Sequence, residues 1–205
     1  MKYKELEKSI LKTANFYDQK KVGHIGPLGF RRSSDLARLS ACMETIIDQG
    51  ILVPGESLFL DMGCADGRVN VLFSYLVKRS IGIELDEWTL DEYEILKKDL
   101  EAALAKDTLP FPPDNITLIH GDSMNEELHK TLYEQTGVNF ESFDLFYTYL
   151  TMYEEFADLI ARKAKKGAAF MVYGLEKVIP KLNGLSLLTQ NEPIQGILAV
   201  YQKCN

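Results

Sequence analysis

Short apolar segments alternate with helical patterns through most of this chain, and this alternation restricts its fold more than any other feature. Strands are predicted over residues 57–62, 80–84, 115–120, 143–147 and 168–173. Helices are predicted over the intervening residues 67–78, 87–105, 123–136 and 151–164. Strands separated by helices of this length form crossover units and pair as a parallel sheet. The pattern therefore predicts an α/β fold with a doubly wound, mostly parallel sheet.

The C-terminal region departs from this alternation. Two apolar segments, 185–190 and 194–203, flank the tripeptide NEP with no helical pattern between them. Such a pair predicts an antiparallel hairpin, which extends the parallel sheet at its edge. The whole sheet then has seven strands, and the predicted architecture is Rossmann-like.

The first 50 residues precede the alternating region. Apolar residues recur at helical spacing over 3–19, which predicts an amphipathic helix. Residues 22–30 contain three glycines and a proline, and a loop is predicted there. Ser33 or Ser34 is expected to cap a second helix that ends near Gly50. We therefore divide the chain into an N-terminal helical lid or extension, 1–50, and a main domain, 51–205.

The composition narrows the functional classes. The 205 residues carry a net charge of −7, so a nucleic acid is not an expected partner, because its binding uses clustered Lys and Arg. No run of about 20 apolar residues is present, so no membrane span is expected. The cysteines and histidines suit neither a metal site nor a disulfide framework, which favours a reducing, cytoplasmic location: Cys42, Cys64, Cys204, His24, His120 and His129.

The segment LFLDMGCADGRV (58–69) joins the first strand of the alternating region to its helix. Gly63, Ala65 and Gly67 are small residues, which let the backbone approach a ligand closely. Asp61 precedes this loop and Asp66 lies within it. Carboxylates there would repel a pyrophosphate bound at the helix N-terminus, so the loop favours a cationic ligand.

Two further acids follow the next two strands. Glu84 ends the second strand, 23 residues after Asp61, and an acid at about that spacing binds ribose hydroxyls in adenosine-type sites. Asp122 follows the third strand and can accept a hydrogen bond from an adenine amino group. Carboxylates at three successive strand ends predict a site for a positively charged nucleoside.

The chain resembles the class I, seven-β-strand S-adenosylmethionine-dependent methyltransferases over roughly residues 57–203, by these acids, the order of elements and the terminal hairpin. KAKKGAAFMVYG (163–174) is similar to the family's fifth strand, whereas Ala65 stands where the family more often has Gly. The resemblance implies S-adenosyl-L-methionine as cofactor, with its methionine part at the loop, its ribose at Glu84, and its adenine at Asp122 and Leu85. The expected cofactor-binding residues are Asp61, Gly63, Cys64, Ala65, Gly67, Glu84, Leu85, Asp122 and Ser123.

The methyl acceptor is expected at the end of the fourth strand, where Tyr147, Thr148 and Tyr149 are the candidate catalytic residues. Aromatic side chains there could frame an amine for in-line methyl transfer, although the two tyrosines could equally be core residues. The segment 142–156 lacks the Asn/Asp-Pro-Pro-aromatic motif of methyltransferases that act on base amines, and it contains no His or Lys as a general base.

The loop 23–36 and the segment GIELDEWTL (82–90) resemble, more weakly, parts of the seven-β-strand protein-lysine methyltransferases. The glycines and Phe30 of the loop suit a lid that excludes water. We therefore favour an amine acceptor, and among amines a protein lysine. A small metabolite as acceptor and a catalytically silent S-adenosylmethionine-binding module remain open alternatives. A nicotinamide-dependent oxidoreductase is disfavoured by the acids of the loop.

Overall fold

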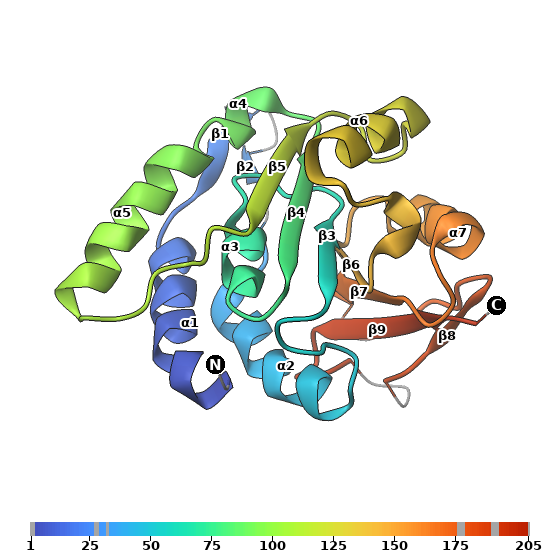
Figure 1. The fold of residues 1–205 in the computed structure, drawn as a ribbon, viewed down its shortest axis with the longest axis horizontal. Helices are drawn as coiled ribbons and strands as arrows, with labels where there is room; N and C mark the ends of the chain where they lie inside the picture. Colours follow the sequence, from blue (N-terminus) through green and yellow to red (C-terminus); the bar gives the residue numbers. More distant parts are fainter. Residues whose placement is uncertain (1–2, 27–28, 32, 176–178, 190–192, 205) are drawn as a thin grey trace.

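A seven-stranded mixed sheet forms the centre of the protein in a computed structural model, which describes residues 3–26, 29–31, 33–175, 179–189 and 193–204 (Figure 1). The side chains of 24–26 and 29–31 lie outside this description. The strands of the sheet are β3 (Leu58–Asp61), β4 (Arg79–Glu84), β5 (Ile116–His120), β6 (Leu145–Tyr149), β7 (Ala169–Tyr173), β8 (Leu185–Leu187) and β9 (Leu198–Lys203).

The strand order is β5-β4-β3-β6-β7-β9-β8. The first five strands pair in parallel, and β9 lies antiparallel between β7 and β8. This arrangement confirms the predicted doubly wound sheet and its antiparallel C-terminal hairpin. The order reverses between β3 and β6, so the carboxyl ends of β3, β4 and β5 border a topological switch point, where such folds bind ligands.

Helices cover both faces of the sheet, and strand periodicity decides which side chain meets which helices. The helices are α1 (Tyr3–Asp18), α2 (Leu36–Asp48), α3 (Arg68–Ser74), α4 (Glu87–Leu90), α5 (Tyr93–Lys106), α6 (Glu126–Thr136) and α7 (Tyr153–Lys163), with a 3₁₀ turn at Phe140–Ser142. Phe59 packs in the core under α1, α2, α3 and α5, whereas its neighbour Leu60 packs under α6 and α7.

The N-terminal helices share a core with the sheet. Leu36, Met43 and Ile46 of α2 are fully buried in the same cluster as Phe59 and Met171. The division at residue 50 therefore stays a prediction about function, because α1 and α2 are packed as parts of one structural unit.

The prediction of a loop over 22–30 is wrong in part. Strands β1 (Val22–Gly26) and β2 (Gly29–Arg31) pair as an antiparallel two-stranded sheet. Backbone hydrogen bonds form such a ladder without large side chains, so the glycines did not prevent it. The hairpin lies beside α4 (Figure 1), and a Cβ atom built on Gly23 would be 3.1 Å from the hydroxyl of Thr89.

The expected cap of the second helix is also wrong. Asp35, not Ser33 or Ser34, is the N-cap of α2, and its carboxylate accepts a hydrogen bond from the Arg38 amide at 2.9 Å. The two serine hydroxyls have tertiary partners instead, since Ser34 bonds Tyr147 and Ser33 bonds Arg68. The sequence could not reveal these distant partners.

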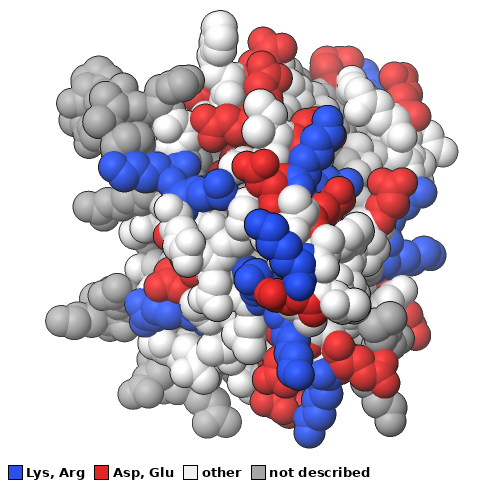
Figure 2. All heavy atoms as spheres, turned by 90° about the vertical axis from the view of Figure 1, so that its left-hand side faces the viewer, with Lys and Arg blue, Asp and Glu red and all other residues white. Residues whose placement is uncertain are grey.

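The predicted helix 87–105 is divided into α4 and α5, and its outer face is charged. Figure 2 shows the side of the molecule on which α1 and α5 lie, with Lys and Arg interspersed among Asp and Glu. Surface ion pairs on this side include Lys12–Asp107 at 2.7 Å and Lys20–Asp99 at 3.9 Å. Mixed charge of this kind is typical of a solvated face. Within the described residues, no helix is both long enough and apolar enough to cross a bilayer.

Candidate active site

A cavity of about 850 Å³ opens at the carboxyl ends of β3, β4, β5 and β6. Its volume is within the range of small-molecule and cofactor sites. It is lined by Met62, Gly63, Ala65, Ile83, Glu84, Leu85, Asp86, Gly121, Asp122, Ser123, Thr148, Tyr149, Leu150, Thr151, Met152 and Phe156. We refer to the residues up to Ser123 as the β3–β5 half and to the remainder as the β6 half.

Glu84 is the central carboxylate of the β3–β5 half. Its side chain lines the cavity, and its residue is only 7% exposed. Oε2 accepts a hydrogen bond from the Ala65 amide and Oε1 accepts one from the Asp86 amide, both at 2.9 Å. Hydrogen bonds from amides to a carboxylate are stronger than those between neutral groups. Glu84 therefore fixes both the glycine loop and the turn after β4.

Asp122 follows β5 on the rim of the same half. Its carboxylate accepts a hydrogen bond from the Met124 amide at 2.9 Å, while the side chain remains exposed. Gly121, which the sequence analysis did not single out, has φ of 150°, and a Cβ there would lie 2.7 Å from Leu128. Leu85, which follows the neighbouring strand β4, also lines the cavity and is 69% exposed. Two acids and one apolar side chain thus border one space.

Asp61 lies behind the cavity and is not among its lining residues. It is 1% exposed, and its Oδ1 has no hydrogen-bond partner within the described part of the chain. Burial, together with the nearby carboxylates of Glu84 and Asp66, raises the pKa of Asp61 well above its usual value. The neutral form of Asp61 is therefore favoured, and the residue contributes to the site through its packing under the loop.

Four predicted residues of the glycine loop have different positions. Gly63 and Ala65 line the cavity, and Ala65 has a left-handed backbone with φ of 50°. Cys64 points away from the cavity and packs against Gly82, where a Cβ atom would lie only 2.7 Å from its sulfur. Gly67 is the N-cap of α3, and a Cβ there would be 2.6 Å from Leu118. Cys64 and Gly67 thus shape the loop without lining the cavity.

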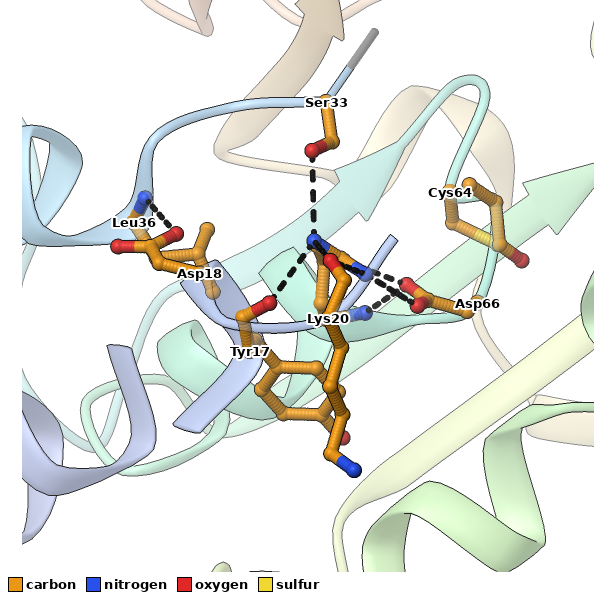
Figure 3. A network of polar contacts seen from close by, with 9 residues as sticks. Tyr17, Asp18, Lys20, Ser33, Leu36, Cys64 and Asp66 are labelled. Atoms are coloured by element: carbon orange, nitrogen blue, oxygen red, sulfur yellow. Dashed lines mark hydrogen bonds and ion pairs between the residues drawn. The ribbon is translucent and has the colours of Figure 1, made fainter. Parts of the chain in front are cut away.

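Asp66 does not face the cavity, contrary to the interpretation that it attracts a cationic ligand. Its carboxylate is fully buried and accepts three hydrogen bonds from the guanidinium of Arg68, at 2.8, 2.9 and 3.2 Å (Figure 3). This charge is neutralised inside the protein. The negative field at the cavity therefore comes mainly from its lining carboxylates, Glu84, Asp86 and Asp122.

The three candidate catalytic residues of β6 separate in the structure. Tyr149, at the end of the strand, lines the cavity and stacks on Tyr173 with ring centroids 5.7 Å apart. Thr148 also lines the cavity, but its hydroxyl donates to the carbonyls of Tyr149 and Thr151. Tyr147 lies within the strand, is 1% exposed and bonds the Ser34 hydroxyl. The expectation that Tyr147 faces an acceptor is wrong, because it belongs to the core.

Solved structures with the same arrangement are methyltransferases. An RNA methyltransferase from Salinibacter ruber, in complex with S-adenosyl-L-homocysteine, superposes with a TM-score of 0.51 at 12% identity, over 85% of this chain and 95% of that chain. The "Putative methyltransferase yhhF" of Escherichia coli gives 0.50 at 15% identity, over 89% and 90%. No protein-family model matches the sequence, and no curated protein sequence matches it significantly. The chain has the class I methyltransferase fold.

The β6 half of this methyltransferase fold contains residues that the sequence analysis missed. Leu150, Thr151, Met152 and Phe156 line the cavity between β6 and α7. Met152 has a left-handed backbone with φ of 52°, a conformation that residues other than Gly rarely adopt. The sequence offered one signal for these residues, which is that most of them directly follow the end of a strand. Their residue types did not distinguish them, because such residues are common in any core. Of the predicted lid, the side chains of His24, Phe30 and Arg31, and the whole of Arg32, lie outside the described residues.

Proposed function

We propose that this protein is an S-adenosylmethionine-dependent methyltransferase that binds its cofactor in the cavity at the carboxyl ends of β3–β6. The position of Glu84 carries this proposal. A carboxylate that ends β4, lines the cavity and is fixed by two backbone amides suits the paired hydroxyls of a ribose. The neighbour from Salinibacter ruber, which has the same fold, was solved with S-adenosyl-L-homocysteine.

The residues of the β3–β5 half fit the parts of this cofactor. Leu85 offers an apolar surface and Asp122 a hydrogen-bond acceptor, which suit the ring and the amino group of adenine. Gly63 and Ala65 allow the methionine part to approach the backbone. S-adenosylmethionine carries its methyl group on a cationic sulfur, and the lining carboxylates of Glu84, Asp86 and Asp122 favour a positive charge nearby.

The acceptor is proposed to be an amine, and among amines a protein lysine. Thr148, Tyr149, Thr151 and Met152 would hold it at the β6 end of the cavity. Among the described lining residues, three are carboxylates and none is Lys or Arg, which suits a positively charged group better than a phosphate. Tyr149 offers an aromatic face to an ammonium group, and the amine must lose its proton before it attacks.

The chemistry asked of the protein is mainly alignment. In an in-line displacement the amine lone pair forms the new N–C bond as the S–C bond breaks, and the proton leaves to water or to a carboxylate. Tyr149 and Thr148 orient the acceptor in this proposal. No described lining residue is a His or Lys that could act as a general base. The acceptor amine must therefore enter the site in its neutral form, or lose its proton there to water or to a lining carboxylate.

Binding and acceptor class can be tested separately. Calorimetry with S-adenosyl-L-homocysteine should give a micromolar or tighter Kd, and binding of NAD in its place would refute the cofactor assignment. A cell lysate incubated with the protein and radiolabelled S-adenosylmethionine would then be digested with protease or with ribonuclease. Loss of label from large molecules on protease treatment supports a protein acceptor, whereas loss on ribonuclease treatment refutes it.

Two further outcomes distinguish the alternatives. Label recovered only in small molecules would indicate a metabolite acceptor. Cofactor binding without any labelled product would indicate a silent binding module. Replacement of Tyr149 by Phe and by Ala tests the acceptor end: turnover should fall several-fold in Tyr149→Ala with an unchanged Kd for S-adenosyl-L-homocysteine. Unchanged turnover in both variants would remove Tyr149 from the acceptor site.

A further inference from the structure

Arg68, the first residue of α3, connects the glycine loop with the N-terminal region. Its side chain is 3% exposed, and it forms a bidentate ion pair with Asp66, whose side chain is fully buried (Figure 3). Nη1 donates to the carbonyls of Tyr17 and Lys20, at 3.2 and 3.3 Å, and to the Ser33 hydroxyl at 3.3 Å. One guanidinium therefore joins the loop, the end of α1 and the segment before α2.

Asp66, within the loop, also bonds the backbone at the start of α3. Besides pairing with the guanidinium, its Oδ1 accepts a hydrogen bond from the Arg68 amide at 3.2 Å, at the start of α3. The residues on either side of it, Ala65 and Gly67, both have left-handed backbones, with φ of 50° and 75°. Such a backbone is costly at an alanine and persists only where neighbouring contacts enforce it. The ion pair is one of these contacts.

The loop shape that results is the one that reaches the cavity. With Ala65 in this conformation, its amide donates to Glu84 at 2.9 Å, and Gly63 and Ala65 both line the cavity. Arg68 and Asp66 do not line the cavity themselves. Their influence on a bound cofactor would therefore pass through the backbone of the loop.

The N-terminal contacts of Arg68 are at the base of the β1–β2 hairpin. Tyr17 and Lys20 precede the hairpin, and Ser33 follows it. A second contact closes the same base, because the Asp18 carboxylate accepts hydrogen bonds from the amides of Leu36 and Ala37 at 2.8 and 2.9 Å. The hairpin itself lies beside α4, next to the turn that contains Asp86 (Figure 1). The region that Arg68 anchors thus borders the β3–β5 half.

A buried ion pair contributes little net free energy to folding, because the cost of removing two charges from water offsets most of their attraction. Here the guanidinium uses Nε, Nη1 and Nη2, each with a described acceptor. We propose that the Asp66–Arg68 pair is a positioning device, which couples the order of the Tyr17–Val22 segment to the shape of the Gly63–Gly67 loop. Cofactor affinity then depends on two residues that do not touch the cofactor. This inference rests on the proposed function.

The first test compares Arg68→Lys with the wild-type protein. Lysine keeps the positive charge but lacks the planar fork, so it cannot pair with Asp66 and reach the N-terminal carbonyls together. The Kd for S-adenosyl-L-homocysteine, measured by calorimetry well below the melting temperature, should rise about tenfold. Lys12→Met is the matched control, because it breaks an ion pair of α1 with Asp107, far along the chain from the loop. Its Kd should stay within about twofold of wild type.

Hydrogen exchange of backbone amides distinguishes a positioning role of Arg68 from a purely structural one, because only the first predicts that ligand binding protects residues 17–22. Adding S-adenosyl-L-homocysteine to the wild-type protein should slow exchange in residues 17–22 as well as in the loop. In Arg68→Lys the ligand should protect the loop but not residues 17–22. A lower melting temperature with an unchanged Kd and unchanged protection of residues 17–22 would overturn the inference.

A milder variant keeps the test informative where Arg68→Lys fails to fold. Ser33→Ala removes a single acceptor of the guanidinium, and it should weaken ligand protection of residues 17–22 while the melting temperature changes little. Protection equal to wild type in Ser33→Ala would count against the coupling. Failure of the wild-type protein to bind S-adenosyl-L-homocysteine would instead refute the proposed function. Wild-type binding combined with wild-type behaviour of both variants refutes only this inference.

Discussion

The two halves of the cavity are lined by different kinds of chemical groups. In the β3–β5 half, carboxylates accept hydrogen bonds from backbone amides, as Glu84 does from Ala65 and Asp86. In the β6 half, the lining groups are hydroxyls, two aromatic rings and exposed apolar side chains such as Leu150 and Met152. The hydrogen-bonded carboxylates of the β3–β5 half suit a cofactor that is held in one position. The hydroxyls and apolar side chains of the β6 half suit an acceptor that enters and leaves.

The contrast also separates a charged half from a nearly neutral one. Burial, together with the nearby carboxylate of Glu84, raises the pKa of Asp61. At the other end, the Tyr149 ring stacks on Tyr173 and the Thr148 hydroxyl is bonded to local carbonyls. Substitutions in the first half should therefore change cofactor affinity, and those in the second should change turnover or stability only.

The largest effect is expected from Glu84→Ala. It removes two charge-assisted hydrogen bonds to the backbone and the proposed contacts with ribose. The Kd for S-adenosyl-L-homocysteine should rise about 100-fold, since hydrogen bonds to charged groups contribute roughly 1.5–3 kcal/mol each. Glu87→Ala, an exposed acid on α4, is the control in calorimetry. A change below about threefold in Glu84→Ala would contradict the importance of the β3–β5 half.

Asp122→Ala should have a smaller effect on the same Kd, about tenfold. It removes the bond to the Met124 amide and the proposed contact with adenine, but the residue is exposed and water can replace part of both. Asp114→Ala, at the other end of the β5 region, should leave the Kd unchanged. Equal effects of the two substitutions would mean that adenine does not lie beside Asp122.

Asp61→Asn tests the buried charge through the pH dependence of stability. Because the folded-state pKa of Asp61 is raised, its contribution to stability is complete below the unfolded pKa of about 3.9 and is lost as pH rises through the folded pKa. Asparagine does not ionise, so the variant should melt about 4 °C above wild type at pH 8, and this difference should shrink towards pH 4. Scanning calorimetry of Asp48→Asn, an exposed acid, provides the control. A difference independent of pH would show that ionisation of Asp61 is not the cause.

The smallest effect is expected in the β6 half, at Met152. Its left-handed backbone, with φ of 52°, costs roughly 1 kcal/mol for a residue with a Cβ atom. Met152→Gly should therefore melt about 2–4 °C above Met152→Ala, which loses the same side-chain contacts but keeps the Cβ. Both variants should bind S-adenosyl-L-homocysteine like wild type. A weakened Kd in either would break the proposed separation of the two halves.

Several elements of the fold were predictable because their signals are local. The strands of the sheet, the helices between them and the terminal hairpin follow from hydrophobic periodicity, and their bounds differ by a few residues. The β1–β2 hairpin was missed, because glycines mark turns and strands alike when only the backbone pairs. The cap of α2 was misplaced by one or two residues, because Ser33 and Ser34 bond residues far away in the sequence.

The candidate site divides in the same way. The acids at 84 and 122 were predicted because a parallel sheet brings all its carboxyl ends to one edge, and position in the sequence then implies position in space. The direction in which a side chain points does not follow from that rule. Asp66 was expected to make the loop favour a cationic ligand, and Tyr147 was a candidate for the acceptor site. A nearby arginine and a distant serine hold their side chains inside the protein.

The sequence by itself determined the layered α/β architecture and the edge of the sheet at which the cavity opens, because both depend on the order and spacing of elements. Only the tertiary structure decided which carboxylates meet the cavity and which are neutralised, since Asp66 is buried against Arg68, whose guanidinium also donates to the Tyr17 carbonyl at the end of α1. Electrostatics at close range depends on distances of a few ångströms between residues remote in sequence, and packing alone sets those distances.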